Sequence, residues 1–362
     1  MAIHIKGFEI EAFRGLRNVK FIDCDHVNLI VGNNNSGKTS VLEALFCCHR
    51  DFAPSSLLES LLCRGSFFRT SFISGVEWLF PHHQEQCSNI ILKIHKKLEN
   101  QQYSLLQIQE EQIEKYSIQF RDISRMNQNI ERDKEENTHQ TTLLRGSYNP
   151  IENGFRLSVN KNDSIKEIEY WEKSTIVKKN YKNDYPAVIM TPYGHRESSF
   201  ASFYTQIIMY NLKENFLKLL KCFDEGIEDV QILTLPNEIS DVYIQHSEVG
   251  LAPLTVFGDG LRRIFCIATV LTQCKNGILL IDEVDAAIHY SAMKDSFDWL
   301  VKGAQALNVQ LFLTTHSLEA VDALIDATKK IVLYRLEHGS AVCRLAHDQL
   351  RRFREEYGME VR

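Results

Sequence analysis

The chain has 362 residues, 44% of them hydrophobic and 24% charged, which is ordinary globular usage and excludes large-scale disorder. Its 41 basic and 47 acidic residues give a net charge of −6, which excludes a polybasic, histone-like protein, so any nucleic-acid binding would need a local basic patch. No apolar run approaches the roughly 18 residues of a membrane helix, no signal peptide is recognisable, and the nine cysteines, without a C-x-x-C pair, indicate buried reduced thiols, so we expect a cytoplasmic protein.

The first fifty residues predict two β-type stretches, a turn and a helix. The stretches are 3–11 and 17–31, and a glycine- and asparagine-rich turn follows at 32–37. Helical spacing of apolar residues then runs from Lys38 to about His49.

A change of composition marks residues 91–185 as an insertion. Polar residues dominate it, with a stretch around 122–140 that we expect to be mobile. Short alternating runs occur at 90–95, 103–108, 155–159 and 168–171. They predict an antiparallel β-rich lobe. The alternative, a long coiled coil over 96–140, is disfavoured because the apolar positions do not keep a heptad through three repeats.

After Pro186 strands and helices alternate, which predicts a parallel sheet with crossover helices. The predicted strands are 187–190, 229–234, 241–246, 277–282, 309–314 and a final hairpin of 330–336 with 341–345. The predicted helices are 198–223, 260–274, 291–306, 317–328 and an arginine-rich helix at 347–357. We therefore expect one α/β unit made of residues 1–90 and 186–362, interrupted by the lobe at 91–185.

The segment GNNNSGKT at 32–39 fits G-x-x-x-x-G-K-[ST] between an apolar strand and a helix. In such a loop, backbone N–H groups and the helix N-terminus bind phosphates. Lys38 would reach the β- and γ-phosphates, and the Thr39 hydroxyl would bind Mg²⁺. Asn35 tolerates a left-handed turn. A chance glycine-rich turn is the alternative, which the correct flanks disfavour. The predicted nucleotide-binding residues here are Gly32, Asn33, Asn34, Asn35, Ser36, Gly37, Lys38, Thr39 and Ser40.

Two acids end the apolar run at 277–281, where a buried parallel strand alone has no need of carboxylates. Beside a bound nucleotide their role is clear. Asp282 would hold Mg²⁺, and Glu283 would orient or deprotonate the attacking water. Solvated acids at an ordinary strand end are the alternative.

Two more segments suggest contacts to phosphate. The glycines of Phe257-Gly258-Asp259-Gly260 open a predicted helix and form an anion-binding turn, although a tight turn capped by Asp259 would look the same. His316 follows the strand at 309–314, where a side chain can reach the γ-phosphate, although a lone histidine is more often structural.

The order of these motifs resembles the ABC-type ATPase heads of the SMC, RecF and OLD-like proteins. The likeness covers residues 1–50 and about 186–335 and includes Phe13-Arg14-Gly15 before the loop. It is closest to prokaryotic AAA/OLD-like ATPases of phage-defence operons. It implies an α/β P-loop head with a mixed core sheet, and ATP and Mg²⁺ as cofactors.

The resemblance also implies a homodimer closed on two ATP molecules, in which Gly258, Asp259 and Gly260 contact the γ-phosphate of the partner's site. His316 would sense that phosphate, Arg14 would approach the nucleotide, and Lys38 and Glu283 would complete the catalytic set. Gly258 stands where transporter-type heads have a serine, and residues 284–289 lack the leucine-aspartate of their dimer loops, where His289 could serve instead.

The resemblance implies a slow ATPase. OLD-type proteins with nuclease activity carry a metal-binding Toprim domain after the ATPase, whereas here only 46 residues follow His316 and no acidic metal cluster appears there, so we expect the chain to gate a separate effector, a nuclease or a toxin. The first alternative is a DNA-binding repair ATPase, with a local patch of basic side chains. That patch would consist of Lys96, Lys97, Lys173, Lys178, Lys179, Lys182, Arg351, Arg352 and Arg354. The second alternative is a scaffold that binds ATP without hydrolysing it, which the positioned Glu283 disfavours.

Overall fold

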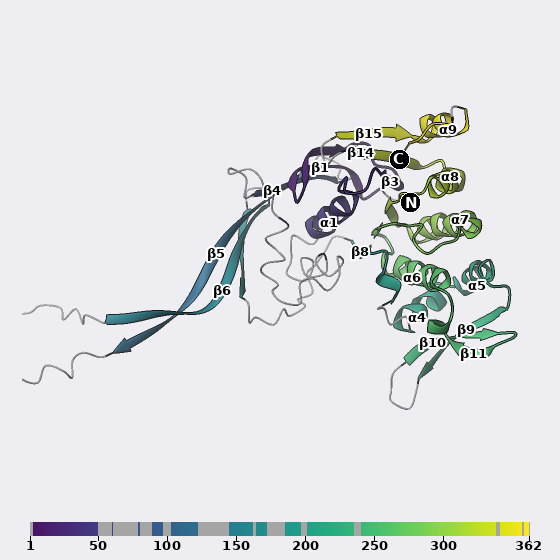
Figure 1. The fold of residues 1–362 in the computed structure, drawn as a ribbon, viewed down its shortest axis with the longest axis horizontal. Coiled ribbons are helices and arrows are strands. Elements are labelled where there is room, and N and C mark those ends of the chain that lie inside the picture. Colours follow the sequence, from purple (N-terminus) through teal and green to yellow (C-terminus); the bar gives the residue numbers. More distant parts are fainter. Residues whose placement is uncertain are drawn as a thin grey trace, which may run out of the picture.

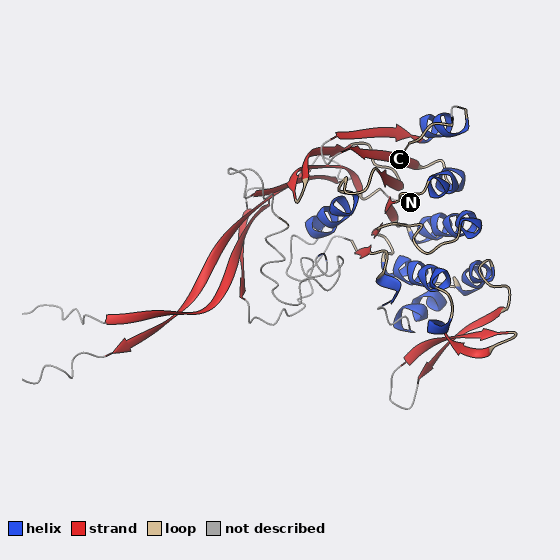
Figure 2. Cartoon of the chain, in the orientation of Figure 1, coloured by secondary structure: helices blue, strands red, loops and turns tan. Residues whose placement is uncertain are grey.

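The computed structural model describes residues 3–49, 60, 79, 89–96, 103–121, 145–161, 164–171, 185–196, 201–234, 240–337, 341–356 and 358–361. These residues form three sheets and a set of helices, drawn in Figures 1 and 2. The predicted mobile stretch at 122–140 lies outside the described residues.

A six-stranded sheet with the order β15-β14-β3-β13-β12-β8 forms the centre of the head. Its strands are β3 (Val27–Val31), β8 (Ala187–Met190), β12 (Ile278–Ile281), β13 (Gln310–Thr314), β14 (Ile331–Glu337) and β15 (Ala341–Ala346). Five of them run parallel, and β15 joins the edge antiparallel to β14. All five residues of β3 and all four of β12 are buried, as expected for central strands covered on both faces.

Side chains alternate between two cores along these strands. Leu279 and Ile281 of β12 join the larger core with α4 (Ala201–Met209) and the helices after it, whereas Ile278 and Leu280 join a second core with α1 (Lys38–His49) and the N-terminal strands. The central sheet is thus the middle of three layers, with α6, α7 and α8 over one face and α1 over the other (Figure 1). The helices are α1 (Lys38–His49), α4 (Ala201–Met209), α5 (Lys213–Lys221), α6 (Asp259–Gln273), α7 (Tyr290–Leu307), α8 (Leu318–Ala327) and α9 (His347–Glu355).

The second sheet has the order β2-β1-β4-β5-β6-β7 and is antiparallel. Its strands are β1 (Ile5–Phe13), β2 (Leu16–Phe21), β4 (Asn89–Lys96), β5 (Tyr103–Arg121), β6 (Arg145–Lys161) and β7 (Ser164–Trp171). Because β4 pairs with β5 only up to Gln109, and β7 pairs with β6 only from Gly154, the remainder of β5 and β6 is a two-stranded ribbon. This ribbon extends away from the head (Figure 1). The β-rich interpretation of this region is confirmed, and β5 replaces the alternative helix over its residues.

The third sheet consists of β9 (Ile227–Thr234), β10 (Ser240–His246) and β11 (Gly250–Pro253), and it lies beside α4 and α5 at the far end of the head (Figure 2). The α/β fold class, with a mixed core sheet and an antiparallel β-rich lobe, is therefore confirmed. The domain boundaries stay a prediction, and the strands of the insertion continue the sheet that β1 and β2 begin.

Two predicted elements are divided in the structure. The stretch 17–31 contains β2 and β3. A turn separates them, and Asp23 in this turn has a φ of 49°. The stretch 198–223 contains α4 and α5, which Asn211 separates with a φ of 55°. An asparagine or aspartate in the left-handed conformation can end a strand or a helix where no glycine is present. The spacing of apolar residues does not reveal such an end.

Six cysteines whose side chains the structure describes are free thiols. Cys24, Cys47, Cys266 and Cys274 are buried as expected. The expectation of burial is wrong for two of them, Cys222 and Cys343, which are exposed.

Candidate nucleotide-binding and catalytic site

The phosphate-binding loop owes its shape to three residues with positive φ. Gly32 has φ 148°, Asn35 has φ 63° and Gly37 has φ 102°. A Cβ on Gly32 would lie 2.3 Å from the carbonyl oxygen of Leu336, and one on Gly37 would lie 2.6 Å from Leu16 Cδ2. Glycine is thus required at both ends of the loop by backbone conformation and by close packing, and the left-handed Asn35 is confirmed.

Lys38 closes the loop from inside. Its ammonium donates to the carbonyl oxygens of Gly32 at 2.7 Å and Asn33 at 2.9 Å, and the side chain is buried. Burial lowers the pKa of Lys38, while the charges of Asp282 and Glu283 act in the opposite direction. A cation with few water contacts therefore stands at the loop, opposite two carboxylates.

The loop and the acidic strand end meet directly. The Thr39 hydroxyl donates to Asp282 Oδ2 at 2.8 Å, although 243 residues separate them in the chain. β3 and β12 both flank β13 in the sheet, so their carboxyl ends lie at the same edge. The two residues that the sequence assigned to Mg²⁺ are therefore adjacent.

Thr314, at the end of β13, orders the acids and was not predicted as a site residue. Its hydroxyl donates to Asp282 Oδ1 at 2.6 Å and accepts the backbone N–H of Glu283 at 2.8 Å. Thr315 donates in the same way to Asp285, two residues beyond Glu283. The sequence did hold a signal for this role, because two threonines end the apolar strand that follows the acid-ended strand along the chain.

Glu283 has a φ of 46° and is half-buried. Burial raises the pKa of its carboxyl, and the charges of Asp282 and Asp285 raise it further, while Lys38 and Arg263 lower it. A carboxylate of raised basicity beside a phosphate-binding loop suits proton abstraction from water better than an ordinary surface glutamate.

Arg263 of α6 is the second residue that sequence reasoning missed. Its side chain has no exposed surface, and it donates to the carbonyl oxygens of Asp282 at 2.9 Å, Glu283 at 3.1 Å and Thr191. Burial lowers the pKa of this guanidinium to about 10, so it remains charged at neutral pH. Because its hydrogen-bond partners are backbone carbonyls, no complementary side chain in the sequence indicates the role of Arg263.

The predicted signature segment begins α6. Gly258 is the N-cap residue, is exposed, and has nothing within 4 Å of where a Cβ would stand. A Cβ on Gly260 would lie 2.7 Å from the carbonyl oxygen of Ala287, in the turn after the acids. Asp259 does not cap the helix; its carboxylate binds Arg262 at 3.2 Å and lies 3.7 Å from His195 Nε2. Among the described residues, the backbone at the start of the helix is therefore exposed at Gly258.

Two predicted residues lie at the margins of this edge. His316 is half-buried in the turn between β13 and α8. Arg14 has a φ of 49° in the turn between β1 and β2, and its Nε lies 2.9 Å from Glu43 Oε2 on α1. The structure therefore joins Arg14 to the helix that follows the loop, and its approach to the nucleotide stays a prediction.

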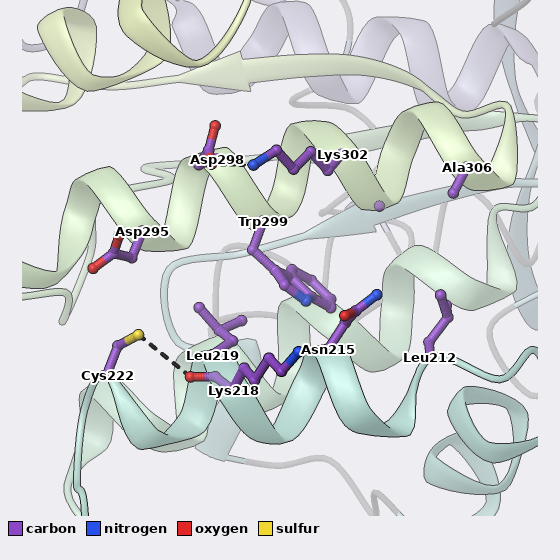
Figure 3. Close-up of a pocket in the computed structure, with 11 residues that line it drawn as sticks. Leu212, Asn215, Lys218, Leu219, Cys222, Asp295, Asp298, Trp299, Lys302 and Ala306 are labelled. Atoms are coloured by element: carbon purple, nitrogen blue, oxygen red, sulfur yellow. Dashed lines mark hydrogen bonds and ion pairs between the residues drawn. The ribbon is translucent and has the colours of Figure 1, made fainter.

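Two hollows differ in their relation to this site. A hollow of about 200 Å³ borders the phosphate-binding loop and the end of β14, where Arg335 and Glu337 form an ion pair of 3.2 Å. A larger one, of about 330 Å³, lies between α5 and α7 around Trp299 and does not include the loop (Figure 3). Of these two hollows, the smaller one is thus lined by residues of the predicted phosphate-binding loop.

The arrangement is that of an α/β P-loop fold with a mixed core sheet, as predicted. A family model described as "AAA domain, putative AbiEii toxin, Type IV TA system" matches residues 103–322, and a second, "AAA ATPase domain", matches residues 4–60. The first match covers more than half of the chain, which belongs to this family of AAA-type ATPase domains. Membership of an OLD-like phage-defence group remains a hypothesis.

Two individual proteins resemble the chain, one of them over most of its length. A Helicobacter pylori protein named ATP/GTP phosphatase is 25% identical over 345 residues, covering 88% of this chain and 87% of its own. A Methanocaldococcus jannaschii protein is 32% identical over 112 residues, which is 29% of this chain and 98% of its own.

Solved structures of head domains also align. An SMC head bound to the C-winged helix domain of ScpA covers 99% of this chain and 100% of its own, with a TM-score of 0.49 and 13% identity. The recombination mediator RecF covers 95% and 98%, with a TM-score of 0.44 and 14% identity. In the part of the chain that the structure describes, no helix is long and apolar enough to cross a membrane.

Proposed function

We propose that the chain binds ATP with Mg²⁺ at the edge formed by residues 32–39 and 282–283, and hydrolyses it slowly. The observation that carries the proposal is the hydrogen bond of 2.8 Å between Thr39 and Asp282. It joins the loop that binds phosphates to the strand end that carries the acids, and Glu283 follows at once in the chain.

The residues at this edge fit Mg²⁺. The Thr39 hydroxyl and the Asp282 carboxylate are hard oxygen ligands that converge on one point, and Mg²⁺ takes one or two such protein ligands together with phosphate oxygens and water. The ion would neutralise charge on the β- and γ-phosphates. Thr314 fixes the orientation of Asp282 by binding its other oxygen, so the carboxylate is oriented before any ligand arrives.

Glu283 would act on the attacking water. Its backbone is held by Thr314 through the N–H and by Arg263 through the carbonyl, so the point from which its side chain reaches towards the loop is fixed. Lys38 would stabilise the charge that develops on the transferred phosphoryl group.

The signature segment would complete the site of a second copy in a two-fold dimer. Support comes from the open N-terminus of α6, where Gly258 is exposed and an anion meets the positive end of the helix dipole. Gly258, Asp259 and Gly260 would approach the γ-phosphate of the partner's ATP, and His316 would sense that phosphate from its own chain.

Purified protein tests the ATPase directly. Lys38→Ala should weaken ATP binding, and Glu283→Gln should retain binding while phosphate release falls at least hundredfold. With ATP, Glu283→Gln should shift from monomer to dimer in light scattering, because the closed state no longer reverts. Unchanged turnover in both variants would overturn the ATPase assignment, and a monomer under all conditions would overturn the composite site.

We further propose that this cycle controls a separate effector, a nuclease or a toxin. The chain would be expressed together with the product of its neighbouring gene, and the activity of that product measured with wild type, Lys38→Ala and Glu283→Gln. An effector that acts equally with all three contradicts the gating proposal. Replication and repair neighbours, with salt-dependent DNA binding strengthened by ATP, would favour the repair alternative instead.

The structure supports the two alternatives less. For DNA binding, Arg354 in α9 is paired with Asp322 at 2.7 and 2.8 Å, which balances its charge. Five of the predicted lysines, Lys97, Lys173, Lys178, Lys179 and Lys182, lie outside the described residues and stay a prediction. For a scaffold without turnover, the fixed backbone and raised pKa of Glu283 would serve no purpose.

A further inference from the structure

Arg263 occupies a position that the proposed chemistry does not yet use. It lies in the second turn of α6, five residues after the exposed N-cap Gly258, and its side chain is completely buried. One terminal nitrogen binds the carbonyl oxygens of Asp282 and Glu283, at 2.9 and 3.1 Å, and the other binds the carbonyl oxygen of Thr191. A single guanidinium thus joins α6 to the ends of two parallel strands, β12 and β8.

These contacts are costly to build. A buried charge is expensive unless it is compensated; the carboxylates of Asp282, Asp285 and Glu283 offset part of this cost, while the hydrogen bonds of this guanidinium in the described structure are to backbone carbonyls. Its Nε has no hydrogen-bond partner there. A neutral side chain, or water, could satisfy three carbonyl groups at lower cost, so a need for a rigid fork accounts for arginine better than burial alone.

The carbonyls that Arg263 holds belong to the residues of the proposed reaction. Glu283 stands at a φ of 46°, a conformation that a non-glycine residue keeps only where surrounding bonds hold it. Thr314 holds its N–H from the side of β13, and Arg263 holds its carbonyl from the side of α6. If α6 moves, the second of these restraints moves with it.

We propose that Arg263 is a positioning residue that fixes the backbone of Glu283 from α6, and so makes catalysis depend on where that helix stands. This inference rests on the proposed function. The N-terminus of α6 would meet the partner's ATP. The same helix would then also fix the position of Glu283, which acts on the protomer's own ATP. Closure of the partner's ATP site on the N-terminus of α6 would therefore change the protomer's own site. The change would pass through α6, the Arg263 side chain and its three hydrogen bonds.

The test compares Arg263→Lys and Arg263→Gln with wild type in nucleotide affinity, kcat and KM. Lysine keeps the charge but cannot span the three carbonyls as a fork, so kcat should fall tenfold to hundredfold while the Kd for ATP stays within threefold. Glutamine should lower kcat at least hundredfold. Arg344→Lys is the matched control, because Arg344 also donates to two backbone carbonyls, those of Ile22 and Asp23, away from the site; its kcat should stay within twofold.

Hydrogen exchange at residues 278–290 supplies a readout that survives loss of turnover. Exchange there should accelerate in Arg263→Lys and not in Arg344→Lys. The proposal is overturned if folded Arg263→Lys turns over ATP within twofold of wild type. It is equally overturned if Kd and kcat deteriorate together in proportion to a lowered unfolding temperature, which would mark a purely structural role. A wild type that fails to hydrolyse ATP refutes the proposed function instead. If Arg263→Gln does not fold, the lysine variant decides.

Discussion

Replacing Thr314 by valine removes a hydroxyl that makes two hydrogen bonds while leaving the side-chain shape nearly unchanged. The bond to Asp282 goes to an ionised carboxylate and contributes about 1.5–3 kcal/mol, and a buried N–H left without a partner, here that of Glu283, costs about 1–3 kcal/mol. Because Glu283 is only half-buried, water meets part of this demand, and we expect Thr314→Val to lower the free energy of unfolding by about 3 kcal/mol.

Equilibrium urea unfolding measures this loss, with Thr314→Ser as the control. Serine keeps both hydrogen bonds and loses one buried methyl group, for which we expect about 1 kcal/mol. The denaturant slope m should be the same in all three proteins. The reasoning is refuted if Thr314→Val costs less than 1 kcal/mol, or if the serine variant is destabilised as much as the valine variant.

Three further outcomes follow from the structure. Since the pKa of Glu283 is raised and the base must be ionised, kcat should be lost as pH falls through a value above the ordinary glutamate range, and a limb at the ordinary value would contradict the burial argument. Gly32→Ala places a Cβ 2.3 Å from a backbone oxygen and should lower Tm by several degrees, whereas Gly15→Ala, with nothing within 4 Å, should shift it by less than 1 °C in the same calorimetric scan. At pH 8 a thiol reagent should label the exposed Cys343 in the native protein and spare Cys24, the pKa of which burial raises to about 12; mass spectrometry reads the sites, and equal labelling would contradict the described burial.

Part of the site could be predicted because its signal is local. Residues 32–39 carry loop, cation and hydroxyl in one uninterrupted motif, and Asp282 and Glu283 stand out as acids after an apolar strand. Sheet topology then brings Thr39 to Asp282 by the rule that parallel strands end at one edge.

The remainder could not be predicted because its partners are distant or lack a side-chain signature. Arg263 binds carbonyl oxygens of residues 19, 20 and 72 positions away, and any residue type supplies a carbonyl. The contact of Arg14 with the nucleotide stays a prediction, and its ion pair with the buried Glu43 could not be foreseen because it depends on where α1 is placed. The division of 198–223 into α4 and α5 turns on the single left-handed Asn211, within a segment in which apolar spacing runs on without a break.

The order of strands in the central sheet has a consequence for how such a head can vary. The turns that carry the chemistry follow β3, β13, β12 and β8, whose pairings with one another involve no residue between 89 and 171. Closing a longer loop costs only about 0.6 kcal/mol for each doubling of its length. The chain between β4 and Tyr185 can therefore lengthen, shorten or be exchanged for another module with little energetic effect on this edge, provided that β4 still pairs with β1 and Leu79 keeps its place in the core. Different insertions at this position are therefore compatible with the same head.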